Sequence, residues 1–93
     1  MADRKKVILI TGCSSGFGYL TALKFARNGW LTFASMRDVE SVGAKELWET
    51  RNKENLPLEL VKIDVKDEIS VKEGAETAAK KTGSIDVLVN NAG

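Results

Sequence analysis

The stretch VILITGCSSGFGYL, residues 7–20, decides the fold that we expect for this chain. It opens with four apolar, mostly β-branched residues, which is the pattern of a strand buried on both faces. Three glycines follow, and apolar side chains then recur at helical spacing as far as Asn28-Gly29. A glycine at that point can adopt the left-handed conformation that ends a helix. The stretch therefore predicts a strand, a glycine-rich turn and a helix, in that order.

The remainder of the chain repeats this alternation. We expect further strands at residues 31–36, 58–63 and 85–89, and Asp38 and Asp67 can cap the helices between them. The order β-α-β-α-β-α-β predicts an α/β, Rossmann-like parallel sheet in which the helices are crossovers. Right-handed crossovers with the strand order 3-2-1-4 would put the first two helices on one face and the third on the other. This arrangement is a truncated, doubly wound fold.

The spacing of apolar residues and the positions of charges also predict which strands lie at the sheet edges and which helix residues face the core. Glu59 and Lys62 make the third strand the most solvent-tolerant, which favours a place at a sheet edge. The fourth strand would be exposed as an edge as well, and because it carries no charge at residues 87–89 we expect self-association through it, or a partner. The helix positions expected to face the core are Leu20, Ala22, Leu23 and Ala26, then Ala44, Leu47 and Trp48, then Ile69, Ala75, Ala78 and Ala79.

Composition narrows the class of protein. A chain of 93 residues has room for one domain. Its 14 basic and 13 acidic residues are interspersed, so there is no electrostatic case for binding nucleic acid or an anionic membrane. A single cysteine excludes an intrachain disulfide, and the lack of histidine excludes a Cys/His metal cluster. No stretch approaches the roughly 20 apolar residues of a membrane span, and a reducing cytoplasm is the expected setting.

The glycine-rich turn suits a pyrophosphate. Its glycines allow sharp turns and close approach of a bulky anion, and the first turn of the following helix offers unpaired N–H groups. Ser14 and Ser15 add hydroxyl donors. The alternative is a strand-to-helix turn that uses glycine for geometry alone. The spacing is neither G-x-G-x-x-G nor a P-loop, and a loop without lysine argues against nucleoside triphosphate hydrolysis.

The end of the second predicted strand bears on the choice of cofactor. Enzymes that prefer NAD place a carboxylate here for the ribose 2′-hydroxyl, whereas a nearby arginine accommodates a 2′-phosphate. Met36 occupies the carboxylate's expected place and Arg37 follows it. Asp38 could become the ribose acceptor after a shift of one or two residues, although its expected role is the helix cap. These residues favour NADP(H), with NAD(H) as the alternative.

Two polar segments follow the third and fourth predicted strands. Asp64 lies where open α/β sheets bind ligands and could accept from an adenine amino group, or it could be a loop acid ahead of Asp67. The segment Asn90-Asn91-Ala92-Gly93 could be a polar turn whose amides satisfy strand-end backbone groups. For this segment the structural and the functional roles can coexist.

Three motifs, each after its expected strand, carry a resemblance to a known family. Thr11-Gly12-x-x-x-Gly16-x-Gly18, Asp64-Val65 and Asn90-Asn91-Ala92-Gly93 resemble the classical short-chain dehydrogenase/reductase family, from about Lys5 to the last residue. The resemblance implies that Arg37 meets the 2′-phosphate of NADP, that Asp64 and Val65 meet the adenine, and that Asn91 also braces the central strands. The residues implied to line the pyrophosphate and adenosine side are Gly12, Ser14, Ser15, Gly16, Phe17 and Gly18, and those near the adenosine ribose are Asn91, Ala92 and Gly93.

The family's catalytic residues are not matched in this chain. Members use a serine, a Tyr-x-x-x-Lys pair and a further asparagine, all beyond the Asn-Asn-Ala-Gly segment. The one tyrosine here is Tyr19, and Leu23 stands four residues later. The resemblance therefore implies a single, incomplete dinucleotide-binding domain over residues 1–93, the amino-terminal part of an oxidoreductase that transfers hydride between nicotinamide and a small carbonyl or alcohol. We expect the 93 residues alone to be inactive. A non-catalytic NADP(H)-binding or regulatory module and a vestigial fragment are the alternatives.

Overall fold

The chain alternates strictly between strand and helix. A computed structural model describes residues 6–14, 16–64, 66–83 and 85–91. The elements in order are β1 (Val7–Ile10), α1 (Gly16–Arg27), β2 (Leu31–Met36), α2 (Val42–Glu54), β3 (Leu58–Lys62), α3 (Glu68–Thr82) and β4 (Val87–Val89).

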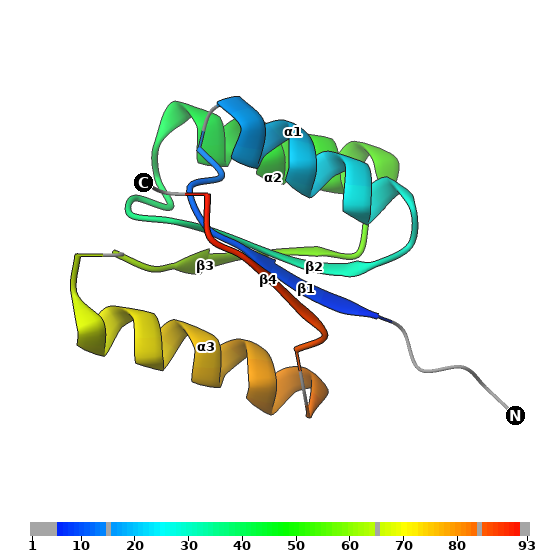
Figure 1. Ribbon diagram of the computed structural model, residues 1–93. Coiled ribbons are helices and arrows are strands. Elements are labelled where there is room, and N and C mark those ends of the chain that lie inside the picture. Colours follow the sequence, from blue (N-terminus) through cyan, green and yellow to red (C-terminus); the bar gives the residue numbers. More distant parts are fainter. Residues whose placement is uncertain (1–5, 15, 65, 84, 92–93) are drawn as a thin grey trace, which may run out of the picture.

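The strands form one parallel sheet in the order β3-β2-β1-β4. In its register, Leu9 of β1 lies opposite Phe33 on one side and Leu88 on the other. Helices α1 and α2 cover one face, and α3 covers the other (Figure 1). The predicted fold class, strand order and distribution of helices are therefore confirmed, and β3 lies at a sheet edge as its charges indicated.

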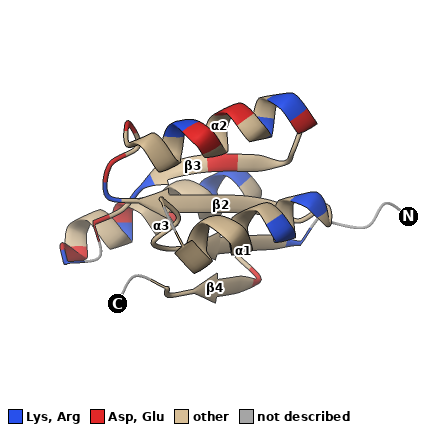
Figure 2. Ribbon diagram, turned by 90° about the horizontal axis from the view of Figure 1, so that it is seen from above, with Lys and Arg blue, Asp and Glu red and all other residues tan. Residues whose placement is uncertain are grey.

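The central strands are buried on both faces because their side chains alternate between two cores. Ile8 and Ile10 pack under α1 and α2, whereas Val7 and Leu9 pack under α3 with Phe33. β1, β2 and β4 contain no charged residue, and the charges lie mainly on the helices (Figure 2). A strand without charges between two covered faces is the expected form for a parallel sheet.

Two residues that were predicted to face the core, one on α1 and one on α3, are exposed. Leu20 is 62% exposed and Ile69 is 67% exposed, although both were expected in the core. On α1 the buried residues are Gly18, Ala22, Leu23 and Ala26, and Leu20 is about 200° around the helix from both Gly18 and Ala22. On α3, Gly74 and Ala78 are buried and set the contact face. Gly18 packs against the Gly12 carbonyl of the loop and Gly74 packs against the Ile63 side chain, and a spacing rule based on large apolar residues does not detect such glycine contacts.

On α2 the prediction holds for Ala44 and Leu47, which are fully buried, but Trp48 is 45% exposed. The guanidinium of Arg51 lies 4.5 Å from the centre of the Trp48 ring. The positive charge over the ring face stabilises the indole at the surface, where Trp48 remains partly exposed to solvent.

The helix caps agree with the sequence at one site and differ at another. Asp67 caps α3, because its Oδ1 accepts from the backbone N–H of Ile69 at 3.0 Å. α2 is capped by Ser41, which accepts from the N–H of Ala44 at 3.2 Å, so the prediction that Asp38 caps this helix is wrong. Asp38 Oδ1 accepts from the N–H of Glu40 at 2.9 Å and forms a tight turn before the helix.

Among the described residues, no helix is both long and apolar enough to cross a membrane.

Candidate cofactor-binding site

The glycine loop joins β1 to α1 at the carboxyl edge of the sheet. Gly12 and Gly16 have φ of 68° and 61°, in the left-handed region that favours glycine. Gly18 serves a different purpose, because a methyl group there would overlap the carbonyl oxygen of Gly12 and come within 2.9 Å of Asn91 Nδ2. Two of the glycines thus shape the turn, and the third lets the first turn of α1 lie directly on it.

Hydrogen bonds to Ser35 hold the loop against β2. The N–H of Cys13 donates to the carbonyl of Ser35 at 2.9 Å, and the hydroxyl of Ser35 donates to the carbonyl of Ile10 at 3.1 Å. The thiol of Cys13 is fully buried and donates to the same carbonyl at 3.1 Å. Burial raises the pKa of this thiol to about 12, against the opposing effect of a backbone hydrogen bond with Ser35. Cys13 is therefore a packing residue of the loop.

The amino terminus of α1 opens towards solvent. Gly16 and Phe17 are exposed there, and Phe17 is 80% exposed. The first turn has no acidic residue, and the basic residues Lys24 and Arg27 lie in the last turn. This distribution leaves the positive end of the helix dipole available to an anion. Ser15, the other predicted hydroxyl donor, lies outside the described residues.

The segment after β4 is tied to the glycine loop. The N–H of Asn91 donates to Thr11 Oγ1 at 2.9 Å, and Asn91 Nδ2 donates to the carbonyl of Gly12 at 3.4 Å. The Thr11 hydroxyl in turn donates to Asn90 Oδ1 at 3.2 Å. Asn91 thereby links the ends of β1 and β4. Ala92 and Gly93 lie outside the described residues.

A cavity of about 250 Å³ brings together the ends of three neighbouring strands. Met36 and Arg37 line it from the end of β2, and residues that follow β1 and β3 line the rest. The last residue of β2 is Met36, which is 2% exposed and carries no carboxylate. Arg37, the next residue, is exposed. The residues that line the cavity are Gly12, Ser14, Met36, Arg37, Ile63, Asp64 and Lys66.

Asp64 is held in a defined turn at this cavity. Its Oδ1 accepts from the N–H of Lys66 at 3.0 Å, and its carbonyl accepts from the N–H of Asp67 at 2.9 Å. Its own N–H donates to Ser70 Oγ at 2.8 Å. The loop role ahead of Asp67 and a place in the cavity thus coexist for Asp64. Val65 lies outside the described residues.

Lys66 lines the same cavity and was missed by the sequence analysis. The available signal was a cation two residues after Asp64, in the turn that precedes α3. That signal alone does not show that the side chain shares a cavity with Arg37, because the two residues are 29 positions apart in the chain.

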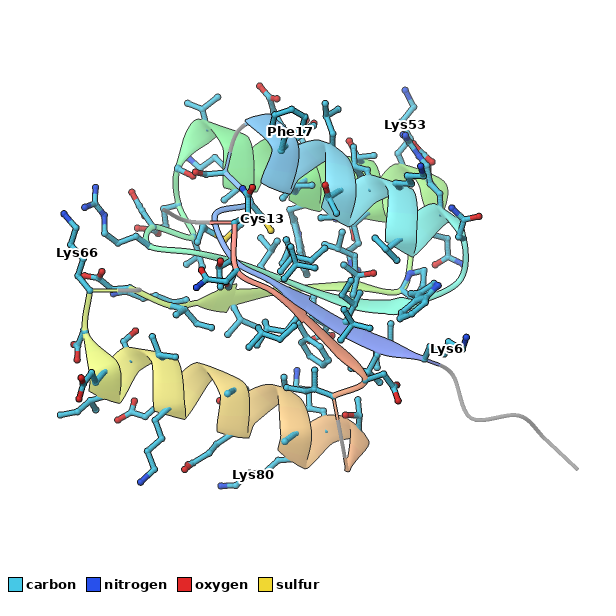
Figure 3. All side chains as sticks on the ribbon, in the orientation of Figure 1. Lys6, Cys13, Phe17, Lys53, Lys66 and Lys80 are labelled. Atoms are coloured by element: carbon cyan, nitrogen blue, oxygen red, sulfur yellow. The ribbon has the colours of Figure 1, made fainter. Side chains whose placement is uncertain are left out.

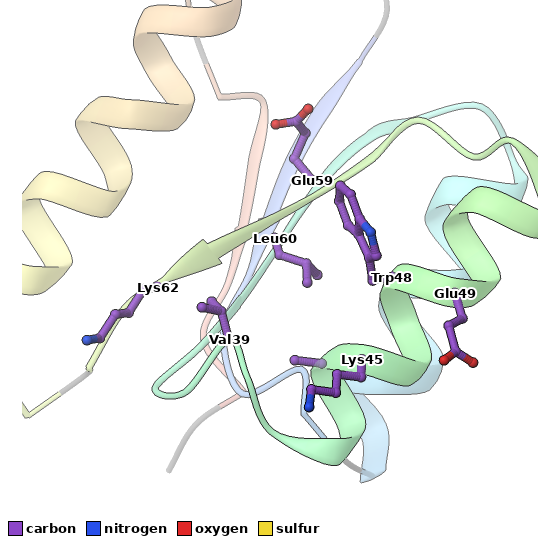
Figure 4. A pocket seen from close by; sticks show the side chains of 8 residues that line it. Val39, Lys45, Trp48, Glu49, Glu59, Leu60 and Lys62 are labelled. Carbon is purple, nitrogen blue, oxygen red and sulfur yellow. The ribbon is translucent and has the colours of Figure 1, made fainter.

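A second, larger cavity of about 590 Å³ lies elsewhere, between α2 and the outer edge of β3. Trp48 and Leu60 face each other across it, with Lys45 and Lys62 towards one end and Glu59 towards the other (Figure 4). It shares no lining residue with the cavity at the glycine loop. Of the predicted site residues that the structure describes, Gly12, Ser14, Arg37 and Asp64 line the smaller of these two cavities, whereas Gly16, Phe17, Gly18 and Asn91 do not.

Comparison with known proteins places this chain in a family. The sequence profile described as short chain dehydrogenase matches residues 6–93. An NADPH-dependent 1-acyldihydroxyacetone phosphate reductase of Schizosaccharomyces pombe is 40% identical over 93 residues, and human 17-beta-hydroxysteroid dehydrogenase type 1 is 38% identical over 95 residues. These alignments cover 98% and 96% of this chain but 29% and 28% of the relatives, so the chain spans under a third of their length.

Solved structures agree with the fold. A hydroxysteroid dehydrogenase from Escherichia coli superposes with a TM-score of 0.87 at 28% identity, over 97% of this chain and 37% of that one. A variant of actinorhodin polyketide ketoreductase solved with NADPH superposes with a TM-score of 0.86 at 28% identity, over 100% of this chain and 35% of that one. With the profile match over almost all of its residues, the chain belongs to the classical short-chain dehydrogenase/reductase family, whose members are NAD(P)-binding oxidoreductases.

Proposed function

We propose that this chain holds the adenosine and pyrophosphate portion of NADP(H), as the cofactor-binding part of a short-chain oxidoreductase. The observation that carries the proposal is the cavity that unites the glycine loop, Arg37 and Asp64 at the carboxyl edge of three adjacent strands. Open α/β sheets bind ligands at this edge. In the proposed domain, residues 1–93 form a single unit that is incomplete as an oxidoreductase.

The described residues divide the work of binding. Gly12 and Gly16 allow the pyrophosphate to approach the main chain, Gly18 lets α1 pack on the loop, and the N–H groups at the start of α1 donate to the pyrophosphate. Ser14 lines the cavity beside them. Asp64 accepts from the adenine amino group, and Asn91 keeps the Gly12 carbonyl in place. By family likeness, Ser15, Phe17, Val65, Ala92 and Gly93 complete the set. The nicotinamide, when bound, supplies the hydride acceptor or donor.

The preference for NADP(H) over NAD(H) rests on Arg37. Its side chain lines the cavity, and the carboxylate that would accept from a free ribose 2′-hydroxyl is replaced by the buried Met36. Asp38 is engaged by the N–H of Glu40, which disfavours its alternative role at the ribose. The S. pombe relative is named as NADPH-dependent, and the ketoreductase was solved with NADPH.

The proposal assigns binding, and not catalysis, to these 93 residues. Carbonyl reduction needs an acid to protonate the carbonyl oxygen. Tyr19 is the only tyrosine, and α1 places Leu23 one turn after it, where the family motif has lysine. Hydride transfer to a carbonyl, or from an alcohol, is therefore proposed for the complete protein. A non-catalytic NADP(H)-binding or regulatory module is the second candidate, because the same residues would serve it unchanged. For the setting we propose the cytoplasm, since the single cysteine of the sequence excludes an intrachain disulfide.

Calorimetric titration with NADPH and NADH tests the assignment. We expect Arg37→Ala to weaken NADPH binding by about 10-fold or more, because a charge-assisted hydrogen bond contributes about 1.5–3 kcal/mol, and to leave NADH nearly unchanged. Arg27→Ala is the matched control, since this exposed arginine pairs with Glu54 at the far end of α1. Equal losses for both cofactors would overturn the NADP(H) assignment. No oxidation of NADPH at 340 nm is expected with carbonyl substrates, and turnover would contradict the division between binding and catalysis.

A further inference from the structure

We propose that Lys66 is a second specificity residue, which acts with Arg37 as a two-cation clamp on the 2′-phosphate of NADP(H). The inference rests on the proposed function and extends it to a residue outside the family motifs. It is carried by the position of the Lys66 turn beside the end of β2, by the charge around the cavity, and by the hydrogen bonds that fix the turn.

The sheet places the two cations at neighbouring strand ends. β2 and β3 are paired in parallel as far as Met36 opposite Lys62, and the N–H of Ile63 donates to the carbonyl of Met36 at 3.0 Å. Adjacent strands lie about 4.8 Å apart. Arg37 leaves the end of β2, and Lys66 lies in the turn just beyond β3, so both border one cavity of about 250 Å³.

The main chain of Lys66 is fixed, but its side chain is not. Its N–H donates to Asp64 Oδ1 at 3.0 Å, and the next residue, Asp67, donates its N–H to the Asp64 carbonyl and caps α3. The side chain is exposed and leaves the turn away from α3, towards the level of α1 and α2 (Figure 3). A lysine whose main-chain N–H is hydrogen-bonded and whose side chain is exposed can follow a ligand that enters the cavity.

Charge supports the same assignment. Among the described residues, neither Arg37 nor Lys66 has an ion-pair partner, whereas Arg27 pairs with Glu54 and Lys81 pairs with Glu59. Of the described residues that line the cavity, Asp64 is the one acid, and its Oδ1 already accepts the Lys66 N–H. A phosphate monoester carries a charge of about −1.5 to −2 at pH 7. One guanidinium leaves roughly half of that charge uncompensated, and a second cation complements it.

The probes that isolate this contact are adenosine 2′,5′-bisphosphate and adenosine 5′-monophosphate, which differ only in the 2′-phosphate. We expect Lys66→Ala to weaken binding of the bisphosphate by about 5-fold, the upper range for an exposed ion pair, and to change binding of the monophosphate by less than about 2-fold. Lys66→Arg should restore most of the loss. The difference between the two probes should also shrink as salt rises, because exposed charges are screened.

Lys62→Ala is the matched control. This lysine is exposed and only four residues away, but it lines the separate cavity between α2 and β3. Lys62→Ala and Lys66→Ala change the net charge equally. An effect of overall charge would therefore weaken binding of the bisphosphate by the same factor in both variants, and that result would overturn the inference. Equal loss for both probes in Lys66→Ala would also overturn it, since the contact would then be to the 5′-phosphate.

The outcomes for Lys66 and for the proposed function are separable. If Arg37→Ala removes the preference for the bisphosphate while Lys66→Ala has no effect, the proposed function stands and the role of Lys66 is refuted. If the unaltered chain does not distinguish the two probes, the NADP(H) assignment and the clamp fail together. Thermal unfolding by circular dichroism checks that each variant retains the fold, and a matched melt is expected because Lys66 contributes only its main chain to the turn.

Discussion

At the scale of single residues, the space around glycines decides how the loop is built. Gly43, near the start of α2, lies so close to the glycine loop that a methyl group there would overlap the carbonyl oxygen of Ser14. The first turn of α2 is thus the support against which Ser14 rests. This contact joins two residues 29 positions apart, and no pattern along the chain indicates it.

Gly43→Ala gives a prediction whose sign is decisive. In an open helix, replacing glycine by alanine stabilises by about 0.5–1 kcal/mol. Here we expect a loss of about 1–3 kcal/mol, as for overpacking, together with weaker NADPH binding because Ser14 is displaced. Urea unfolding and calorimetry measure the two effects. Val42→Ala, at the exposed preceding residue, is the control and should affect neither. A more stable Gly43→Ala variant would show that the close contact is absent in solution.

The buried thiol of Cys13 predicts a dependence of stability on pH. Burial raises its pKa to about 12 in the folded chain, from 9.0. Between these values the unfolded chain loses the thiol proton and the folded chain keeps it. Deprotonation therefore favours the unfolded state, and the free energy of unfolding falls as pH rises above 9. The free energy of unfolding should fall by about 1 kcal/mol more between pH 9 and pH 10 in the unaltered chain than in Cys13→Ala. Identical pH profiles, or rapid reaction of the native thiol with a disulfide reagent at pH 8, would contradict this account.

At the scale of elements, the sequence predicted which segments form strands and helices, but it predicted less accurately which helix side chains are buried. β1 was predictable because an uncharged, mostly β-branched run precedes a glycine-rich turn, and β2 because an uncharged run follows the helix stop at Asn28-Gly29. Leu20 and Ile69 were misassigned because the spacing rule counts large apolar residues, whereas Gly18 and Gly74, which pack against Gly12 and Ile63, are among the buried residues of α1 and α3. The positions of Arg37 and Asp64 were predictable because each lies within two residues of the end of a strand.

The cap of α2 offers a test at this scale. We expect Ser41→Ala to destabilise the chain by about 1 kcal/mol, because Ser41 accepts from the N–H of Ala44. Asp38→Ala should have a smaller effect, since it removes only the turn bond from the N–H of Glu40. Chemical denaturation of both variants measures the order. If Asp38→Ala proved the more destabilising, the helix would begin where the sequence alone suggested.

At the scale of the whole molecule, the two sheet edges differ in character. β3 carries Glu59, which pairs with Lys81 on α3, and Lys62, and such charges discourage pairing with another chain. β4 has the sequence Val87-Leu88-Val89 and pairs with β1 alone in the described sheet. Leu88 is 63% exposed and borders an apolar cavity beside α3. The fold therefore presents one protected edge and one edge suited to further pairing.

We expect the 93-residue chain to self-associate through β4. Light scattering over a dilution series should show a species larger than the monomer that dissociates on dilution, and Leu88→Lys should shift the chain to monomer by placing a charge on the open edge. Leu20→Lys is the matched control, because Leu20 is 62% exposed on helix α1 and not on an edge strand, and the same change there should leave association unaltered. A sharp monomer that resists changes in concentration and melts cooperatively would refute association. Equal loss of association in both variants would place the contact on the general apolar surface, because only pairing through β4 makes the position of the charge matter.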